Sequence, residues 1–372
     1  MENSSVRQFI NRNSNDPIFF IGTRAELIKV APVITRLTQS GIPIKLLWAG
    51  LHADAALGVD KFERVSQYSL RRSKKDQDSI FSICVWFLKN LIDVITYGLA
   101  ARVSRHGPKV VVVHGDTLCT VLGSLFAKAS GAKLMHIEAG VRSGKFWLPF
   151  PEEISRRFVS RLTDLNFAPG EKESQNLIRH RGDVVNTVHN TSRDALSLLV
   201  NDLQFGDDGY LVVTLHRAEL LSNKKKFAEV VQKIVELSRN YPVKWFVGNH
   251  ERNALSSMGL LESVTQSEIQ LFERSSHAEF VKTLIRAHCV ITDSHGLQAE
   301  CNDSGIPVIV HRSETEYSNP DNSPCVLTNW KVAVFDDFLF NLRKGDEPRG
   351  IRSKVVAAEI ISQRIALEVS GI

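Results

Sequence analysis

The chain alternates short apolar runs with segments whose apolar residues recur at helical spacing, and this alternation limits its fold most strongly. The first run, Pro17–Ile21, stops at Gly22-Thr23-Arg24, and Ala25–Leu37 then shows helical spacing. Similar runs at 43–48, 110–113 and 133–137 each end in a polar or glycine-bearing loop. Strands that alternate with helices form a parallel sheet, which binds its ligands beyond the carboxyl ends of the strands.

The same alternation begins again in the second half of the chain, with apolar runs at 210–214, 243–247, 289–292 and 307–310. The predicted fold class is therefore α/β, with two Rossmann-like doubly wound domains facing a cleft, and 372 residues suit two domains. The polar, turn-like segment 186–190 predicts domains at 1–190 and 191–353. Residues 354–372 are expected to form a helix that packs back on the first domain or on the second.

Composition excludes several classes of protein. Hydrophobic residues make up 43% and charged residues 23%, as in globular proteins. The net charge of +5 comes without a long basic run or a basic-aromatic motif, which argues against a nucleic-acid partner. The five cysteines form no CxxC pair, and the first residues lack a basic region followed by an apolar core. We expect a reduced, cytoplasmic location.

The segment 80–100 is apolar and about as long as a bilayer span. Lys89, Asn90 and Asp93 interrupt it, and a charge in the middle of a span costs about 2.5 to 3.5 kcal/mol, so a buried amphipathic helix is favoured. Because basic residues cluster upstream at 71–75, an interfacial helix on anionic lipid is the alternative.

Candidate site residues of the first domain follow its predicted strands. Arg24 and Lys29 open the first helix, where cations beside a helix N-terminus would bind phosphate; a capped surface helix is the alternative. Asp116 follows the strand at 110–113 and is either a catalytic carboxylate or a helix N-cap.

Two further acidic positions follow the next strand. Glu138 comes directly after it, and Glu152-Glu153 lies one short loop later. Crowded carboxylates push one another's pKa values apart, as acid–base catalysis requires. The alternative for Glu152-Glu153 is an acidic first turn of a helix.

The second domain offers a diphosphate site. His216 could donate to a diphosphate and Arg217 could bind one with its planar fork, although structural histidines are common. Ser294, His295 and Gly296 follow the strand at 289–292 and begin a helix where phosphate could lie, with Glu300 deeper, in reach of ribose hydroxyls.

Motifs for other chemistries do not occur. The chain has no GxGxxG after its first strand and no GxxxxGK[ST], which argues against a nicotinamide enzyme and a P-loop NTPase. It also has no HExxH. We expect no cofactor and no metal.

Several motifs occur together in one order. They read GTRAELIKVAPV at 22–33, HGDT at 114–117, HIEAGVR at 136–142, PEEISR at 151–156, DSHGLQAE at 293–300 and, more weakly, Thr315-Glu316 before Tyr317. Taken together they resemble the UDP-N-acetylglucosamine 2-epimerase family from about Ile21 to Tyr317. The resemblance implies a GT-B-like pair of Rossmann domains.

The resemblance also implies a reaction, in which UDP is eliminated to give 2-acetamidoglucal and is then added back at the sugar. Asp116, Glu138 and Glu152 match the family's acid and base carboxylates. Arg24, Lys29, His216 and Ser294 would hold the diphosphate, Glu300 the ribose, and Phe280 would stack on uracil. The catalytic assignment is Asp116, Glu138, Glu152 and His216. The substrate-binding assignment is Arg24, Lys29, Arg142, Arg156, Arg217, Phe280, Ser294, His295, Gly296 and Glu300.

The branch of the family follows from the same motifs. Hydrolysing relatives carry HIEGG and lack the PEE element, whereas this chain has HIEAG at 136–140 and keeps Glu152-Glu153. The resemblance therefore implies a non-hydrolysing epimerase that interconverts UDP-GlcNAc and UDP-ManNAc for a surface polysaccharide. Family members are usually homodimers. The alternatives are a GT-B glycosyltransferase, an epimerase of another UDP-2-acetamido sugar, a hydrolysing 2-epimerase, or a non-catalytic nucleotide-sugar binding protein.

The chain departs from the family pattern at a few positions. Ala25 replaces a proline, His295 replaces a glycine beside the phosphate, and Ala218 stands where the family has a second Arg. Lys244 and the segment 49–52 differ from the residues that bind an activating UDP-GlcNAc in many bacterial members. The departures put an activating site and the identity of the sugar in question.

Overall fold

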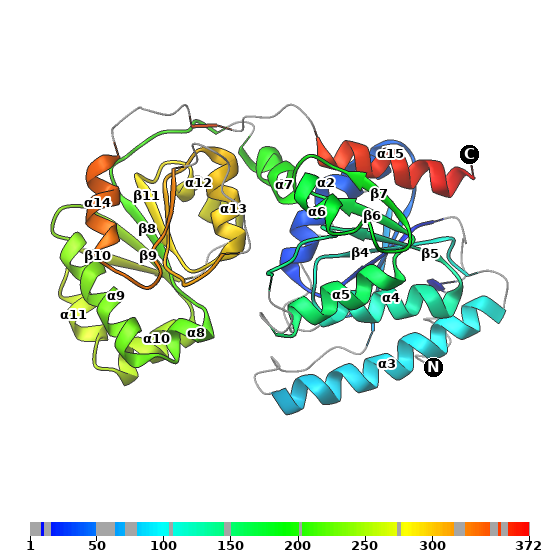
Figure 1. Cartoon of the computed structure of the whole chain (residues 1–372), viewed down its shortest axis with the longest axis horizontal. Coiled ribbons are helices and arrows are strands. Elements are labelled where there is room, and N and C mark those ends of the chain that lie inside the picture. The colour runs from blue at the N-terminus through cyan, green and yellow to red at the C-terminus, as the bar shows by residue number, and fades with distance from the viewer. Residues whose placement is uncertain are drawn as a thin grey trace. The chain divides into compact units, whose positions relative to one another are not determined.

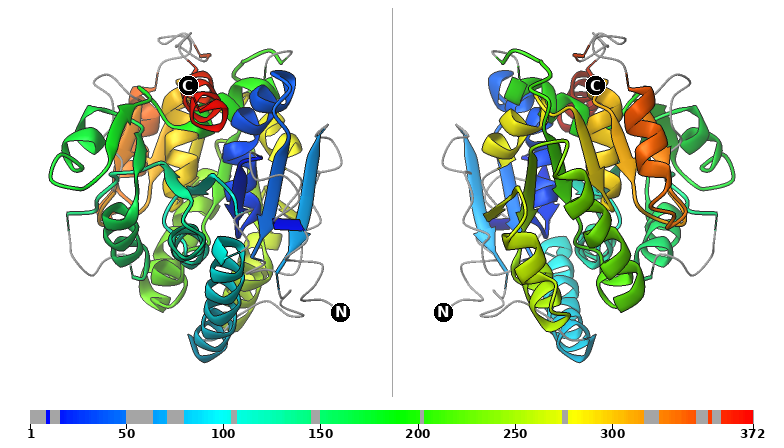
Figure 2. Two further views of the ribbon diagram at one scale, coloured as in Figure 1. Left: turned by 90° about the vertical axis from the view of Figure 1, so that its right-hand side faces the viewer. Right: turned by 90° about the vertical axis from the view of Figure 1, so that its left-hand side faces the viewer.

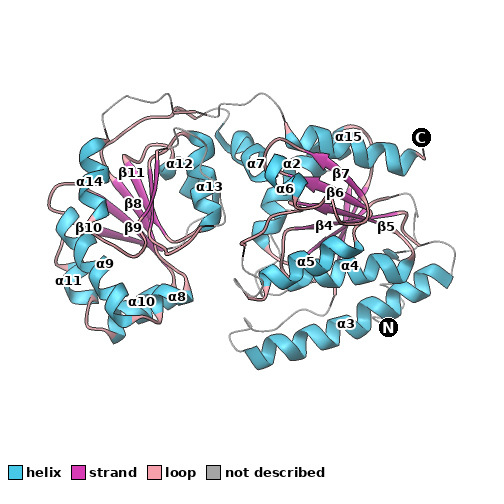
Figure 3. Ribbon diagram, viewed as in Figure 1, coloured by secondary structure: helices cyan, strands magenta, loops and turns pink. Residues whose placement is uncertain are grey.

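A computed structural model describes residues 9–10, 16–49, 64–70, 80–103, 107–144, 150–200, 203–273, 277–315, 324–342, 349–350 and 356–371. The chain divides into two compact units, unit 1 (Met1–Ala195 with Lys354–Ile372) and unit 2 (Leu196–Ser353). Each unit has one parallel sheet between helices (Figures 1 and 3). The predicted α/β class with two doubly wound domains is confirmed.

The sheet of unit 1 has seven described strands in the order β3-β2-β1-β4-β5-β6-β7, and every pair is parallel. The strands are β1 (Ile18–Ile21), β2 (Ile44–Trp48), β3 (Val65–Ser69), β4 (Val110–His114), β5 (Lys133–Ile137), β6 (Leu165–Ala168) and β7 (Asp183–Asn186). Every residue of β1, β2, β4 and β6 is buried, because helices cover both faces of a parallel sheet.

Helices cover both faces of this sheet. They are α2 (Arg24–Gln39), α3 (Ile80–Val103), α4 (Leu118–Ser130), α5 (Glu152–Leu162), α6 (Glu171–Gln175), α7 (Thr191–Val200), which runs past the unit boundary, and α15 (Ala357–Ser370). One apolar core lies under α3 and α4, and the other lies under α2 and α15. The C-terminal helix α15 packs along α2, and the backbone NH of Ala358 donates to Asp194 at 2.6 Å.

Helix α3 lies along α4 (Figures 1 and 2). Gly98 allows the close approach, because a Cβ there would lie 2.6 Å from Ala129 Cβ. Trp86, Asn90, Asp93, Val94 and Tyr97 are buried, while large apolar side chains on the opposite face are exposed: Leu88, Ile92, Ile95, Leu99 and Val103. By length and composition alone, 83–103 could cross a membrane. The basic residues at 71–75 lie outside the described residues.

Unit 2 repeats the architecture with six described strands in the order β10-β9-β8-β11-β12-β13. Its strands are β8 (Leu211–Thr214), β9 (Val243–Val247), β10 (Ile269–Glu273), β11 (Cys289–Thr292), β12 (Val308–Val310) and β13 (Cys325–Leu327). Its helices are α8 (Ala218–Leu221), α9 (Lys224–Leu237), α10 (Asn249–Ser257), α11 (Leu261–Thr265), α12 (His277–Leu284), α13 (His295–Ser304) and α14 (Val334–Asn341). Apolar cores lie on the two faces of the sheet.

Candidate active site

Each sheet has a switch point, which is a pair of neighbouring strands from which the strand order runs outward in opposite directions. The strand order reverses between β1 and β4 in unit 1, and between β8 and β11 in unit 2. Open α/β sheets bind ligands outside the carboxyl ends of the strands at such a switch point. The loops after three of these strands carry Asp116, His216 and Ser294, and Arg24 is the first residue of α2 after β1, as the sequence predicts.

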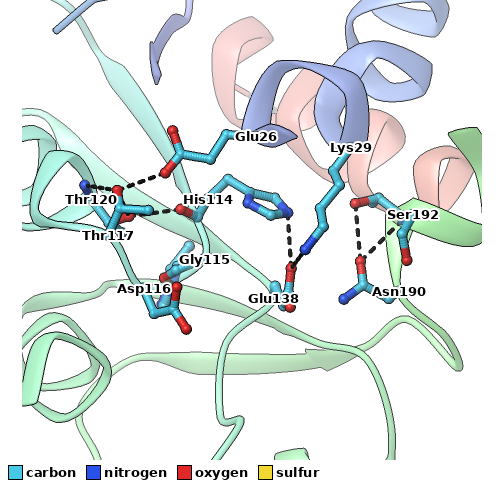
Figure 4. Close-up of polar contacts among 12 residues, drawn as sticks. Glu26, Lys29, His114, Gly115, Asp116, Thr117, Thr120, Glu138, Asn190 and Ser192 are labelled. Atoms are coloured by element: carbon cyan, nitrogen blue, oxygen red, sulfur yellow. Dashed lines mark hydrogen bonds and ion pairs between the residues drawn. The ribbon is translucent and has the colours of Figure 1, made fainter. Parts of the chain in front are cut away.

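A buried carboxylate, Glu26, joins two loops of unit 1. Its Oε2 atom accepts from the backbone NH groups of Gly22 (2.7 Å) and Thr23 (3.0 Å), and Thr117 Oγ1 donates to Oε1 at 2.6 Å (Figure 4). Thr117 also caps α4. Burial raises the pKa of Glu26 against the opposing effect of the bond from Thr117. Glu26 thereby fixes the loop after β1 to the loop that carries Asp116.

The second carboxylate of unit 1, Glu138, follows β5 in a left-handed backbone conformation with φ of 66°. Lys29 Nζ lies 3.0 Å and His114 Nε2 3.1 Å from its Oε2 atom, and the Asn190 side chain also hydrogen-bonds to it. Figure 4 shows Lys29 and His114 converging on this carboxylate. Three elements distant in sequence thus hold one side chain.

These partners decide the charge of Glu138. Burial by itself raises the pKa of the carboxyl group, but Lys29, His114 and Asn190 together hold it well below the usual 4.5. Glu138 is therefore ionised at neutral pH. Lys29, which the sequence assigns to a phosphate grip, is an ion-pair partner of Glu138.

Asp116 belongs to a second network, which is centred on α5. Arg156 donates to Asp116 Oδ2 from Nε at 2.9 Å, and its other guanidinium nitrogen Nη2 lies 2.6 Å from the same oxygen. Buried Glu153 accepts from Arg157 Nε at 2.8 Å and from the backbone NH of Ser143 at 3.0 Å. Arg156, assigned to substrate binding, therefore positions Asp116.

Two other predicted residues lie beside this network. The Oε2 atom of Glu152 is buried and has no hydrogen-bond partner among the described residues. Arg142 donates to the backbone carbonyl of Val141 at 2.8 Å and to Ser160 Oγ at 2.9 Å. Burial, reinforced by the arginines of α5 and opposed by Glu153, lowers the pKa of Arg142 to about 10, so it stays charged. Arg24 is exposed and forms no ion pair with a described residue.

In unit 2 the buried Asp293 organises the loop after β8. Its carboxylate accepts from the backbone NH groups of His216 (3.0 Å) and Arg217 (2.8 Å), and His216 Nδ1 lies 3.4 Å from Oδ1. The imidazole is 38% exposed, so its Nε2 side can meet a ligand. Asp293 thus orients the histidine that the sequence assigns to the diphosphate.

Helix α13 begins at the neighbouring strand end. Ser294 caps it by accepting from the backbone NH of Leu297 at 3.4 Å, while its own NH donates to Thr292 Oγ1 at 2.9 Å. His295 and Gly296 form the first turn, and a Cβ built on Gly296 meets nothing within 4 Å. The space beside Gly296 and the helix N-terminus suit an anion.

The remaining predicted residues of unit 2 lie on α12 and α13. Phe280 packs edge-on against Phe246 with ring centres 4.9 Å apart and is partly exposed. His277 Nε2 lies 3.9 Å from Glu300 Oε1. Thr315 Oγ1 donates to Gln298 Oε1 at 2.6 Å, which joins two of the sequence motifs. Glu316, Tyr317 and His52 lie outside the described residues.

Sequence reasoning assigned no role to Glu26, His114, Asn190 or Asp293. Three of them, Glu26, His114 and Asp293, belong to the quoted motifs, and their place in those motifs was the available signal. All three are polar residues that the structure buries. Asn190 gave no signal beyond a turn-like segment.

Lys244 Nζ lies 3.7 Å from the centre of the Tyr210 ring. No group of three or more His, Cys, Asp or Glu residues in the described part of the chain is placed to hold a metal ion.

The fold and these loops define a class of protein: a GT-B-like α/β protein with clustered carboxylates after the strands of one Rossmann-type unit and a glycine-bearing helix start after a strand of the other. A family model described as UDP-N-acetylglucosamine 2-epimerase matches residues 39–320. The UDP-N-acetylglucosamine 2-epimerase of Neisseria meningitidis is 31% identical over 319 residues, which cover 79% of this chain and 82% of that protein. This chain belongs to the UDP-N-acetylglucosamine 2-epimerase family.

Solved structures agree with this assignment. The Neisseria meningitidis enzyme bound to UDP-GlcNAc is 26% identical, with a TM-score of 0.73 over 94% of this chain and 98% of that one. The Methanocaldococcus jannaschii enzyme in complex with UDP-GlcNAc and UDP is 23% identical, with a TM-score of 0.74 over 94% of this chain and 99% of that one. The second likeness concerns the fold alone.

Proposed function

We propose that the chain is a non-hydrolysing epimerase that interconverts UDP-GlcNAc and UDP-ManNAc for surface polysaccharide biosynthesis. The observation that carries the proposal is the carboxylate of Glu138, which Lys29, His114 and Asn190 keep ionised beside the switch point of unit 1. An ionised, oriented carboxylate is suited to remove a proton from carbon. The UDP-GlcNAc bound to the Neisseria meningitidis relative supports the substrate class.

The reaction needs a base and an acid. A carboxylate takes the proton from C2 of the sugar, the C–H electron pair forms the C1–C2 double bond, and the C1–O pair leaves with UDP. A UDP oxygen then adds back to C1, and a second group returns a proton to the opposite face of C2. Glu138 is the proposed base, and Asp116 and Glu152 are the other carboxyl groups proposed to act as acids and bases.

Unit 2 is proposed to bind the leaving group. Negative charge builds on UDP as the C1–O bond breaks, and preorganised donors lower the energy of that transition state. His216, which Asp293 orients, and the N-terminus of α13 at Ser294 would supply such donors, and Arg217 would add a cation. Phe280 and Glu300 are proposed to contact uracil and ribose.

Phosphorus and proton NMR of the enzyme with UDP-GlcNAc, without added metal or acceptor, tests the proposal. Formation of UDP-ManNAc with the diphosphate still attached to the sugar is the expected result. Free UDP together with ManNAc would show instead that the chain is a hydrolysing epimerase. Turnover of another UDP-2-acetamido sugar, with UDP-GlcNAc unchanged, would correct the substrate.

We also propose that the enzyme is a cytoplasmic homodimer. The exposed apolar side chains of α3, among them Leu88, Ile92 and Leu99, offer a surface that association would bury. Light scattering should then give twice the chain mass of 41.6 kDa. A monomer that sediments with anionic vesicles would instead favour the interfacial role for α3.

A further inference from the structure

Glu138 has a backbone conformation that its side chain does not favour. Its φ of 66° lies in the left-handed region, which L-residues with a Cβ rarely adopt. Outliers of this kind persist where surrounding contacts over-determine them, and they cluster at functional sites. The contacts that fix Glu138 therefore need an explanation of their own.

Those contacts come from three different parts of unit 1. Lys29 lies in α2, His114 ends β4, and Asn190 directly precedes α7. Lys29 is a long, partly exposed cation, whereas His114 is 2% exposed and rigidly placed at a strand end. The Asn190 side chain is itself fixed, because its Oδ1 atom accepts from the backbone NH of Ser192 at 3.1 Å. Two of the three partners are thus preorganised.

The imidazole of His114 is buried with one nitrogen close to the Glu138 carboxylate. Both of its ring nitrogens are buried, and neither has a well-aligned hydrogen-bond partner in the described part of the chain. Its Nε2 atom lies 3.1 Å from the Glu138 carboxylate, which can only accept when ionised. A proton on Nε2 would lie between the imidazole and this carboxylate, where it can stabilise the ionised form.

We propose that His114 and Asn190 are positioning residues that hold the Glu138 carboxylate ionised and aimed for proton abstraction, a role that the ion pair with Lys29 does not fill alone. The proposal rests on the proposed epimerase function. His114 then acts in the reaction through Glu138 and does not contact the substrate. A Lys29 side chain that moves toward a diphosphate would leave Glu138 still held by two fixed donors.

The other charged and titratable groups near Glu138 leave this assignment unchanged. His136 on β5 bonds to the backbone carbonyl of Gly115 through Nε2 at 2.7 Å, and burial lowers its pKa to about 4, so it is neutral at pH 7. Glu26 lies on the far side of His114 (Figure 4), and the charge interaction with His114 lowers the pKa of Glu26. His136 therefore offers a matched control: a buried histidine on the adjacent strand whose ring nitrogens make no hydrogen bond to Glu138 in the described part of the chain.

Infrared titration of the whole protein tests the proposal without turnover. The protonated carboxyl band of Glu138 is assigned by difference against Glu138→Gln and followed from pH 7 downward past the usual carboxyl pKa of 4.5, as far as the protein stays folded. His114→Leu and Asn190→Ala should each move its midpoint upward by about one pH unit or more, since each removes a donor to the ionised form. His114→Gln, whose amide NH can replace Nε2–H, should stay near wild type, and so should His136→Gln.

The acid limb of the pH profile of kcat/KM should move with the infrared midpoint in the same variants. An unchanged midpoint in His114→Leu and Asn190→Ala, with a shift in Lys29→Met alone, would overturn the proposal. An equal shift in His136→Gln would also overturn it, because it would show a general loss of packing. If wild type fails to epimerise UDP-GlcNAc, the proposed function fails, while the infrared result still decides how Glu138 is held.

Discussion

Lys29 shows why the sequence predicts the role of a single side chain only in part. A lysine in the first turns of a helix after a strand predicts an anion site. The structure supplies the anion from within, since Glu138 lies 3.0 Å from Lys29 Nζ although 109 positions separate the two residues. Such a pair depends on which strand neighbours which, and local spacing in the sequence does not contain that information.

The left-handed backbone of Glu138 gives a stability prediction. Glycine adopts positive φ without the Cβ penalty, so Glu138→Gly should unfold with a free energy about 1 kcal/mol higher than Glu138→Ala. Urea unfolding measures the difference. The same pair at Glu152, the first residue of α5, should show the opposite order. Equal stability of the two Glu138 variants would contradict the strain.

The three carboxylates proposed to be catalytic give an activity prediction. Asp116→Asn, Glu138→Gln and Glu152→Gln should each lower kcat about 100-fold or more, because each removes an acid or base, while UDP affinity changes little. Steady-state kinetics and UDP titration measure the two effects. Glu171→Gln, at an exposed position in α6, is the control and should keep wild-type kcat. Normal kcat in all three variants would refute the assignment.

At the scale of elements, the strands that the sequence predicts are largely buried ones. All eight apolar runs form strands of the two sheets. The pattern missed the buried strand β6 and the edge strands β3, β7, β10 and β13, whose residues are largely half-buried or exposed. An edge strand is held by backbone pairing on one side, so its sequence need not be apolar. VSQYS at 65–69 and DVVN at 183–186 carry no such signal.

Two glycines at strand-to-helix turns should respond differently to alanine. In Gly22→Ala the new Cβ would lie 2.0 Å from Cys119 Sγ, so the loop after β1 must move from α4 at a cost of about 1 to 3 kcal/mol in unfolding free energy. Gly296 belongs to α13, and a Cβ at this position would meet nothing within 4 Å. Because alanine is the better helix former, Gly296→Ala should keep or raise the free energy of unfolding. Its UDP affinity should fall if the phosphate lies against that turn.

Urea unfolding and UDP titration of both variants provide the check. A Gly22→Ala protein as stable as wild type would mean that the loop after β1 is not packed as described. Undiminished UDP affinity in Gly296→Ala would place the diphosphate elsewhere.

At the scale of the whole molecule, each unit contains a buried histidine that resists protonation. Burial lowers the pKa of His136 in unit 1 and of His311 in unit 2 to about 4, from 6.5. As pH falls from 6.5 towards 4, the unfolded chain binds these protons and the folded chain does not. Stability is therefore fully present above pH 6.5 and is lost on acidification.

For each of the two histidines, the free energy of unfolding should fall by about 2 kcal/mol when the pH is lowered from 7 to 5. Urea unfolding at the two pH values should show this loss, and His136→Gln should reduce the part that belongs to unit 1. The depressed pKa of Glu138 acts in the same direction at lower pH. A stability that is constant from pH 7 to pH 5 would contradict burial of the two neutral imidazoles.

The most direct test of the central claim is proton NMR of the enzyme with UDP-GlcNAc in deuterated water. If an ionised Glu138 abstracts the proton at C2, deuterium should appear at C2 of the UDP-ManNAc formed, and Glu138→Gln should slow its appearance by about 100-fold or more. UDP-ManNAc that retains the original proton at C2, or wild-type exchange in Glu138→Gln, would contradict the account.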